Sequence, residues 1–477
     1  MSIKYKITGL LMMLILGIHA QESNSKPNII YINVDDLGWK DVGYMGGEYY
    51  ETPVIDNLAT QGMTFSQGYA AAANCAPSRA CLMSGQNTPR HGVYTVLSSE
   101  RGHPKTRKII PIKNTKHLTD AQFTMGEMFK KAGYATGTFG KWHVTKNPLN
   151  DGFDVNIGGD HRGNPGGKGH YAPYNKLPNL DIADEGENLT DRLTNEAIQF
   201  IQDHKSEPFF LYLPYYAVHT PLMGKKHLIE KYQQKANAQS HRNPIYAAMV
   251  ENVDTNIGYL LQTLEDLNLT NNTLLVFTSD NGGIRSISHQ DPLRAGKGSY
   301  YEGGTRVPYI IKWPGKIKPN TQSNIPITNL DFFPTFQSVL ELELPNKILD
   351  GVNLMPLLAG KKIAKRDLFW HFPVYLQPYN SKDDDGRDPL FRTRPGSTVI
   401  HGKWKLHQYF ENNDLELYNL KKDLGERHNL AATHPKKTQQ LLRILKKWRK
   451  DLNAPVPSQL NPKFDADFLP KSRKNKH

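Results

Sequence analysis

Short apolar runs alternate with helix-like segments along the first three quarters of the chain. The strand-like runs are residues 28–34, 135–140, 209–213 and 273–279. The helix-like segments between them are residues 124–132, 191–204 and 245–267. Strands separated by helices imply a mainly parallel sheet with helices on both faces. The sequence therefore predicts an α/β fold with a large, mainly parallel sheet sandwiched by helices.

The alternation of strand-like and helix-like segments ends at about Gly360. Residues 398–407 resemble a hairpin turning at His401-Gly402, residues 415–418 read as a further strand, and residues 434–452 form a basic helix pattern. The predicted organisation is a large domain over residues 21–360. A smaller antiparallel sheet with a helix follows over residues 361–477, contributes to the ligand cleft and ends in a loose tail.

The first twenty residues predict a signal peptide. Lys4 and Lys6 precede an apolar run over residues 9–18 that is too short to span a bilayer, and Ile18-His19-Ala20 resembles a cleavage site. The expected location is periplasmic or secreted, with no stable membrane span. An uncleaved anchor helix is the alternative interpretation.

The chain has two cysteines, Cys75 and Cys81. They lie six positions apart in a segment with a helical pattern, which would separate their Cα atoms by about 9 Å. That separation is too long for an unstrained disulfide. An exported protein with two cysteines that cannot pair needs another reason to keep at least one of them.

Reactive side chains follow each strand-like run: Asp35-Asp36, then residues 140–143, 218–221 and 280–283. Ligands of parallel sheets bind beyond the carboxyl ends of the strands. Among these side chains Asp35, Asp36, Asp280 and Asn281 are hard oxygen donors, which suit Ca²⁺ or Mg²⁺. Each Asp taken alone also fits a turn or a helix cap.

The segment from Cys75 to Gly85 predicts a short helix with a reactive start. Pro77 fits the first turn and Gly85 fits the end. Cys75 would then lie at the helix N-terminus, where free N–H groups favour an anion, and Arg79 follows one turn later. This arrangement combines a nucleophile with a cradle for an oxyanion.

The same segment, Cys75-Ala-Pro-Ser-Arg79 with its Ser84-Gly85 ending, resembles the signature of the formylglycine-dependent (type I) sulfatases of the alkaline phosphatase-like superfamily, especially bacterial polysaccharide sulfatases. The resemblance extends over most of the chain. Its further parts are Asp35-Asp36, residues 52–58, 140–143, 219–221, 280–283, 296–298, 302–308 and 416–419.

This resemblance implies a set of roles. Cys75 would be oxidised to 3-oxoalanine (formylglycine) by a formylglycine-generating or anaerobic sulfatase-maturating enzyme, and its hydrate would attack sulfur. The implied catalytic residues are Cys75, Arg79, Lys141, His143, His219 and Lys297. The implied metal ligands are Asp35, Asp36, Cys75, Asp280 and Asn281, with Ca²⁺ favoured and Mg²⁺ possible. His143 is the expected base for the second hydroxyl, and His219 the expected acid for the leaving alcohol.

Basic residues elsewhere point to an anionic substrate and not to nucleic acid, and the formal net charge is +13. We expect substrate contacts from His161, Arg162, His170, Arg392 and Arg394. A basic loop over residues 101–108 could also line the cleft. Such loop charges are also common on solvated surfaces.

The expected substrate is a sulfated carbohydrate, such as oligosaccharides from an algal polysaccharide like ulvan. The alternatives are glycosaminoglycan fragments, a phosphomonoesterase or phosphonate hydrolase of the same fold, and a non-catalytic protein that binds polyanions. The last alternative leaves Cys75 without a role.

Overall fold

A computed structural model describes residues 26–174, 176–180, 183–235, 243–288, 290–344 and 346–468. The predicted signal peptide (residues 1–20) and most of the predicted loose tail, including residues 471–477, lie outside these ranges. No helix within the described ranges is long and apolar enough to cross a membrane.

The large sheet has eight strands in the order β5-β4-β6-β1-β7-β8-β2-β9. All neighbours from β5 to β7 pair in parallel, whereas β8 is antiparallel to both of its neighbours. In chain order the strands are β1 (Asn28–Val34), β2 (Met63–Phe65), β4 (Ala135–Phe139), β5 (Val155–Ile157), β6 (Phe209–Pro214), β7 (Thr273–Ser279), β8 (Tyr309–Lys312) and β9 (Thr321–Ser323). The predicted mainly parallel sheet is confirmed.

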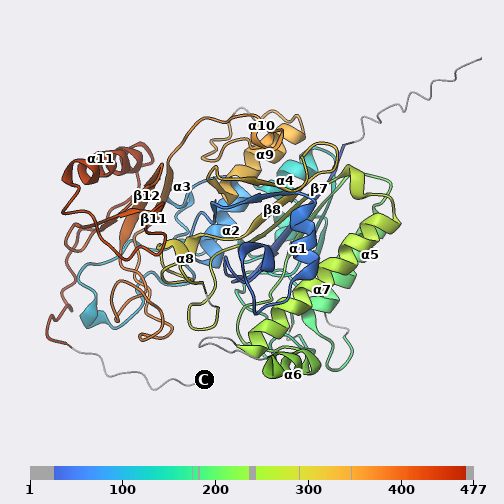
Figure 1. Ribbon diagram of the computed structural model, residues 1–477, viewed down its shortest axis with the longest axis horizontal. Helices are drawn as coiled ribbons and strands as arrows, with labels where there is room; N and C mark the ends of the chain where they lie inside the picture. The colour runs from blue at the N-terminus through green and yellow to red at the C-terminus, as the bar shows by residue number, and fades with distance from the viewer. Residues whose placement is uncertain are drawn as a thin grey trace, which may run out of the picture.

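Helices cover both faces of this sheet (Figure 1). One layer contains α1 (Pro53–Thr60), α5 (Leu189–Asp203), α6 (Lys226–Gln234) and α7 (Pro244–Asp266). The other contains α2 (Cys75–Ser84), α4 (Met125–Lys131), α9 (Phe332–Val339) and α10 (Met355–Leu358). Strand β1 packs against both helix layers because its side chains alternate in direction. Ile30 and Ile32 pack against the first layer, while Ile29 and Tyr31 pack against the second. A strand covered on both faces has no polar face, which explains its continuous apolar run.

Short elements connect these layers. They are α3 (Thr88–His91), α8 (Glu302–Thr305), the paired strands β3 (Gly68–Tyr69) and β10 (Ile327–Thr328), and the 3₁₀ turns η1 (Gly43–Met45), η2 (Pro104–Thr106), η3 (Pro148–Asp151), η4 (Thr270–Asn272) and η5 (Asn329–Asp331).

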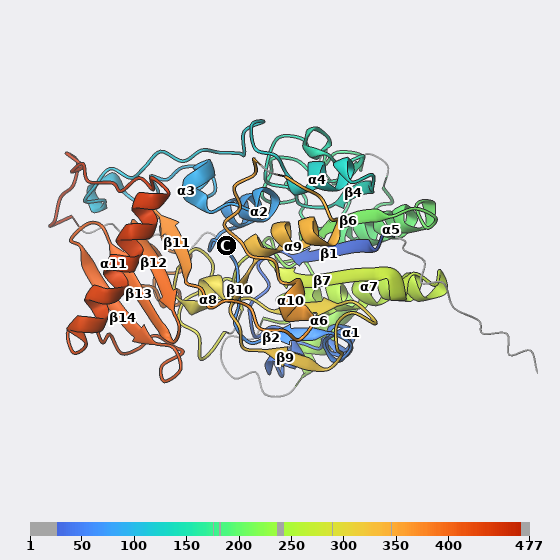
Figure 2. The same ribbon diagram turned by 90° about the horizontal axis from the view of Figure 1, so that it is seen from above.

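The C-terminal part forms a second, antiparallel sheet of four strands in chain order (Figure 2). Its strands are β11 (Leu368–Phe372), β12 (Gly396–His401), β13 (Trp404–Tyr409) and β14 (Asp414–Asn419), followed by α11 (Pro435–Asp451). Leucines of α11 cover one face, where Leu441 and Leu445 pack on Val399 and Leu406. The predicted smaller sheet with a helix is confirmed, while the proposed boundary at residue 360 stays a prediction.

The opposite face of the small sheet packs against the large domain. The ring of Phe372 stacks on Tyr300 at 3.8 Å, and Trp370 donates to the carbonyl of Ala70. A buried ion network reinforces the contact: Lys405 Nζ lies 2.8 Å from Glu302 Oε1 and 3.2 Å from Glu426 Oε1. Since these charges have no access to water, each depends on the others, and the two sheets are held in one fixed arrangement.

Candidate active site

The four strands predicted to end in reactive side chains are direct neighbours in the sheet, in the order β4-β6-β1-β7. They run in parallel, so their carboxyl ends meet at one edge. Asp35 and Asp36 follow β1, and Asp280 and Asn281 follow β7. The segments after β4 and β6 carry the remaining predicted groups, Lys141, His143 and His219. Sheet order therefore converts four distant sequence segments into one site.

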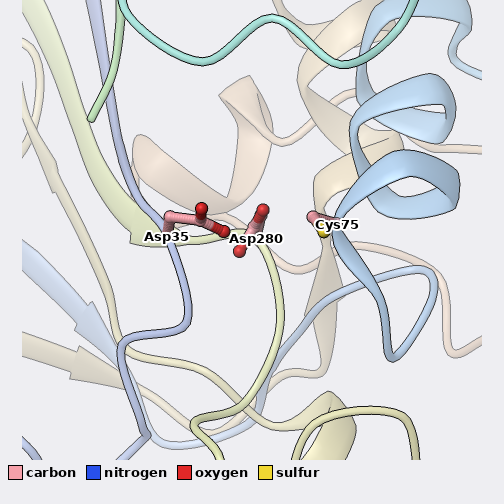
Figure 3. A group of neighbouring side chains, drawn as sticks. All are labelled: Asp35, Cys75 and Asp280. Atoms are coloured by element: carbon pink, nitrogen blue, oxygen red, sulfur yellow. The ribbon is translucent and has the colours of Figure 1, made fainter. Parts of the chain in front are cut away.

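Helix α2 brings Cys75 to this edge. The helix begins at Cys75, its N-cap Asn74 makes no side-chain cap, and it ends at Gly85 in the left-handed conformation with φ 68°. One oxygen each of Asp35 and Asp280 and the Sγ of Cys75 lie within 4.8 Å of one another. Figure 3 shows the Asp280 side chain between those of Asp35 and Cys75. The predicted nucleophile position thus lies next to carboxylate oxygens.

Three buried cations pair with three buried carboxylates. Lys141 Nζ lies 2.6 Å from Asp35 Oδ2, Lys297 Nζ lies 2.7 Å from Asp36 Oδ2, and Arg79 Nε lies 2.8 Å from Asp280 Oδ2. Arg79 also donates to the carbonyl of Lys141, which follows β4. The formal charges cancel, so addition of a divalent cation would leave the site positive and suited to an anionic ligand.

The oxygen atoms of this group fit a hard cation. Asp35 Oδ1 and Asn281 Oδ1 are buried and accept no hydrogen bond. Burial, opposed in part by Lys141, raises the pKa of Asp35 to about 8, and the Asp280 carboxylate adds to the rise. A Ca²⁺ or Mg²⁺ ion would satisfy these acceptors and remove that cost. Both oxygens of Asp36, in contrast, accept hydrogen bonds: Asn281 Nδ2 donates to Oδ1 and Lys297 Nζ donates to Oδ2.

Two histidines flank the group. The Nδ1–H of His219 donates to the carbonyl of Thr220, which leaves Nε2 pointing inward, 3.7 Å from Asp36 Oδ2. His143 takes a positive φ of 57°, and its buried Nδ1 has no hydrogen-bond partner. Burial lowers the pKa of both rings, and nearby Lys297 and Lys141 lower it further. Both are therefore neutral when no ligand is bound.

The expected substrate residues after β5 have different surroundings. His161 is exposed, and its ring lies edge-on to His117 at 6.1 Å. The Arg162 Nε donates to Asp160 Oδ2 at 2.6 Å. His170 is only 1% exposed and its Nε2–H donates to the carbonyl of His219. The structure therefore places His170 behind His219, as a support for that segment and not as a surface that meets substrate.

The two arginines expected from the C-terminal part also differ. Arg394 is paired with carboxylates on both sides, since its Nε lies 2.6 Å from Asp388 Oδ2 and its Nη1 lies 2.8 Å from Glu411 Oε2. Arg394 thus has carboxylate partners inside the C-terminal part, and its contact with substrate stays a prediction. Within the described ranges Arg392 makes no ion pair with a carboxylate, and its side chain packs over Gly298.

The basic loop is mostly occupied with structural contacts. Lys105 pairs with Asp465, His103 stacks on Phe468, and Arg107 donates to the carbonyl of Gly102. Arg101 donates through Nη2 to the carbonyl of Val96 at 2.7 Å, and burial, followed by the charge of Arg392, lowers its pKa.

Tyr379 was not predicted from sequence, yet its ring lies under the Arg392 guanidinium at 3.7 Å. It belongs to the segment between β11 and β12, where no sequence pattern marks an approach to the large domain.

Comparisons with known proteins agree with this geometry. A family model described as Sulfatase matches residues 27–342, and a model for the C-terminal part of N-sulphoglucosamine sulphohydrolase matches residues 296–454. A protein of Formosa agariphila named Sulfatase is 34% identical, over 91% of this chain and 89% of its own length. The N-acetylgalactosamine-6-sulfatase of Rattus norvegicus is 30% identical, over 93% of this chain and 89% of its own.

Among solved structures, that of Ps i-CgsB in complex with k-i-k-neocarrahexaose superposes with a TM-score of 0.74. It is 29% identical to this chain and covers 92% of this chain and 95% of its own.

Proposed function

This chain belongs to the sulfatase family and is a sulfuric ester hydrolase, and from this premise we propose that it releases sulfate from sulfated carbohydrates. The observation that carries the proposal is the meeting of Cys75 with Asp35 and Asp280 within 4.8 Å, at the start of a helix and among three buried cations. Such a site combines a nucleophile position, oxygen donors for a metal and positive charge for an anionic ester.

The reaction would use two groups that the unmodified chain does not contain, a divalent cation and 3-oxoalanine. A divalent cation held by Asp35, Asp36, Asp280, Asn281 and the modified Cys75 would polarise the sulfate and make the nucleophile more acidic. The 3-oxoalanine formed from Cys75 would supply, as its hydrate, one hydroxyl for attack and a second for release of sulfate. Family membership implies both groups, and we favour Ca²⁺ because an irregular set of oxygens tolerates its flexible geometry.

The chain's own residues would position and neutralise the ester. Lys141 and Lys297 are bound to two of the carboxylates, Asp35 and Asp36, and would neutralise the negative charge that builds up on the sulfate oxygens. Arg79 fixes the nucleophile end, because it bridges Asp280 and the segment after β4. The inward Nε2 of His219 is bare in the neutral ring; it would take up a proton when the anionic ester binds and deliver it to the leaving alcohol, with Lys297 beside it. His143 is the proposed base for the second hydroxyl.

For the substrate, we propose oligosaccharides from an algal polysaccharide such as ulvan, with glycosaminoglycan fragments as the second candidate. Two similarities support a sugar sulfate in general: one relative is named for N-acetylgalactosamine 6-sulfate, and one similar structure contains a neocarrahexaose. We further propose export by the signal peptide and maturation of Cys75 by a formylglycine-generating or anaerobic sulfatase-maturating enzyme.

The test is sulfate release from a panel of defined ulvan, carrageenan and chondroitin oligosaccharides, measured by ion chromatography on protein with confirmed 3-oxoalanine. We expect turnover of at least one sugar sulfate, and much slower turnover of the matched phosphate ester. Activity on aryl sulfates with none on any carbohydrate would reject the sugar proposal, and a preference for phosphate would favour the phosphomonoesterase alternative.

A further inference from the structure

Arg392 is an arginine of the C-terminal part that is inserted beside the active site. Its side chain lies against Gly298, where an added Cβ would come within 2.5 Å of Arg392 Nε. Gly298 follows Lys297, whose ammonium group is bound to Asp36. The Arg392 guanidinium therefore lies one residue away from the cation that faces the ester.

The hydrogen-bond donors of the Arg392 guanidinium are not used by the surrounding residues that the structure describes, although Asp384 is close enough for the charge of Arg392 to lower the Asp384 pKa against the effect of burial. The residue is only 5% exposed, and its Nε and Nη1 are buried without a hydrogen-bond partner. No ion pair joins it to a carboxylate within the described ranges. Its guanidinium lies on the face of the Tyr379 ring. Arginine is rarely buried unless it is paired, because loss of hydration must be offset by another interaction. Asp384 does not fill this role, because its oxygens accept from the backbone N–H groups of Tyr379 and Asn380, so the free Nε and Nη1 point to an anion from outside the chain.

A second arginine strengthens this conclusion. Arg101 lies near enough to Arg392 to have its pKa lowered, and the position of Cys75 also affects the Arg101 pKa. Tyr379 in turn acts on the pKa of both Arg101 and Lys297. Arg101, Tyr379 and Arg392 therefore form one cluster that reaches the Cys75 position. Two like charges held together cost free energy that a bound anion would recover.

We propose that Arg392, with Arg101, forms a second anion subsite next to the scissile ester, which we call the Arg392 subsite. It would bind a second negatively charged group of the same sugar or its neighbour, either a sulfate or a carboxylate, through the free Nε and Nη1 of Arg392. The inference rests on the proposed function and deepens it: the substrate is a sugar sulfate that carries at least two anions. Arg392 is then a specificity-determining residue.

The test compares anions as competitive inhibitors of 4-methylumbelliferyl sulfate hydrolysis. The probes are N-acetylgalactosamine 6-sulfate with one anion, N-acetylgalactosamine 4,6-disulfate with a second sulfate, and the chondroitin 6-sulfate disaccharide with a carboxylate. We expect the second anion to lower the inhibition constant about 10- to 100-fold in the wild type, as charge-assisted hydrogen bonds do. The disulfate and the disaccharide tell a sulfate subsite from a carboxylate subsite.

Arg392→Gln should abolish this difference between probes, and Arg392→Lys should keep part of it. Arg394→Gln is the matched control: it removes a neighbouring arginine whose partners are Asp388 and Glu411, so the preference should stay while thermal stability falls. Because Arg392→Gln breaks no hydrogen bond of its side chain, its thermal unfolding should not shift downward, which separates binding from misfolding.

Equal inhibition by the probes with one and two anions in the wild type would overturn the proposal. So would a preference that survives Arg392→Gln. The readout uses an aryl ester, so failure of the subsite is distinct from failure of the proposed function, which would appear as no sulfate release from any carbohydrate by the wild type.

Discussion

At the residue scale, the two cysteines have different surroundings although both belong to α2. Cys75 opens the helix beside Asp35 and Asp280. Cys81 lies in a small apolar cluster with Ala71 and Leu330, its Sγ is 3.6 Å from His91 Nε2, and burial raises its pKa. Both are free, as their predicted separation required. Cys75 is therefore placed for chemistry and Cys81 for packing.

We expect active protein to carry 3-oxoalanine at position 75, because a thiol cannot provide the second hydroxyl that releases sulfate. Mass spectrometry of the peptide around position 75 should show sulfur replaced by carbonyl oxygen, and a hydrazide probe should label the protein. Cys75→Ser should fold, because serine is similar in size, but should not turn over in a host that leaves serine unmodified.

Cys81→Ser is the internal control. It should keep the chemistry and lose stability by about 1 to 3 kcal/mol, as expected for a polar group placed in an apolar site. Multiple turnover by protein that is shown to contain only unmodified Cys75 would contradict the mechanism.

At the scale of elements, the carboxyl ends of β1 and β7 form the metal site. These strands pair in parallel with Val34 opposite Ser279, so Asp35 and Asp280 follow at the same level. The turn after β7 is tightly held, since a Cβ on Gly282 would lie 1.9 Å from the carbonyl of Gly303 in α8. The ligand set is thus fixed by backbone packing before any ion binds.

Removal of the metal should therefore abolish activity without unfolding the protein. After exhaustive chelation we expect no sulfate release, recovery with Ca²⁺ or Mg²⁺, and a higher melting temperature when the ion is added, because binding to the folded state alone stabilises it. Asp280→Ala should lose the metal-dependent shift in melting temperature. Full activity in protein shown by elemental analysis to be free of metal would disprove the site.

At the scale of the whole molecule, stability depends on histidines that are buried in the neutral form. Burial lowers the pKa of His91 and of His371 to about 3, and that of His170 to about 4. His371 joins the small sheet to the chain after α11: its Nε2–H donates to the carbonyl of Pro455, and its Nδ1 accepts from Ser397. Its contribution requires the neutral ring.

The sign of the pH effect follows from these values. Unfolded histidine titrates near pH 6.5, so the contribution of His371 is complete above that pH and is lost as the pH falls toward 3. At pH 5 each such histidine lowers the free energy of unfolding by about 2 kcal/mol. In urea unfolding, the wild type should lose free energy of unfolding between pH 7.5 and pH 5. In His371→Gln this loss should be smaller than in the wild type by about 2 kcal/mol.

His227→Gln, which changes an exposed ring, is the matched control and should follow the wild type. An unchanged pH dependence in His371→Gln would show that the ring is not held neutral.

Sequence alone was sufficient for the central elements and for the chemistry of the site. The apolar runs that became β1, β6 and β7 are strong because these strands are buried along their whole length. The helical patterns of α5 and α7 are strong because each helix buries one face. The short strands β2, β5 and β9 were missed, because three residues are too few to show a period. The Cys75 segment and the carboxylates after the strands could be identified because each is a short, continuous stretch of sequence.

Only the tertiary structure decided which charges are available. His170, Arg392 and Arg394 are equivalent in sequence as basic residues in loops. Folding buries His170 behind His219 and pairs Arg394 with Asp388 and Glu411. Arg392 lies on the Tyr379 ring, and its Nε and Nη1 find no acceptor among the described residues. The physical reason is that a local pattern fixes which groups follow a strand, whereas the partner of a charge depends on which distant segment packs against it.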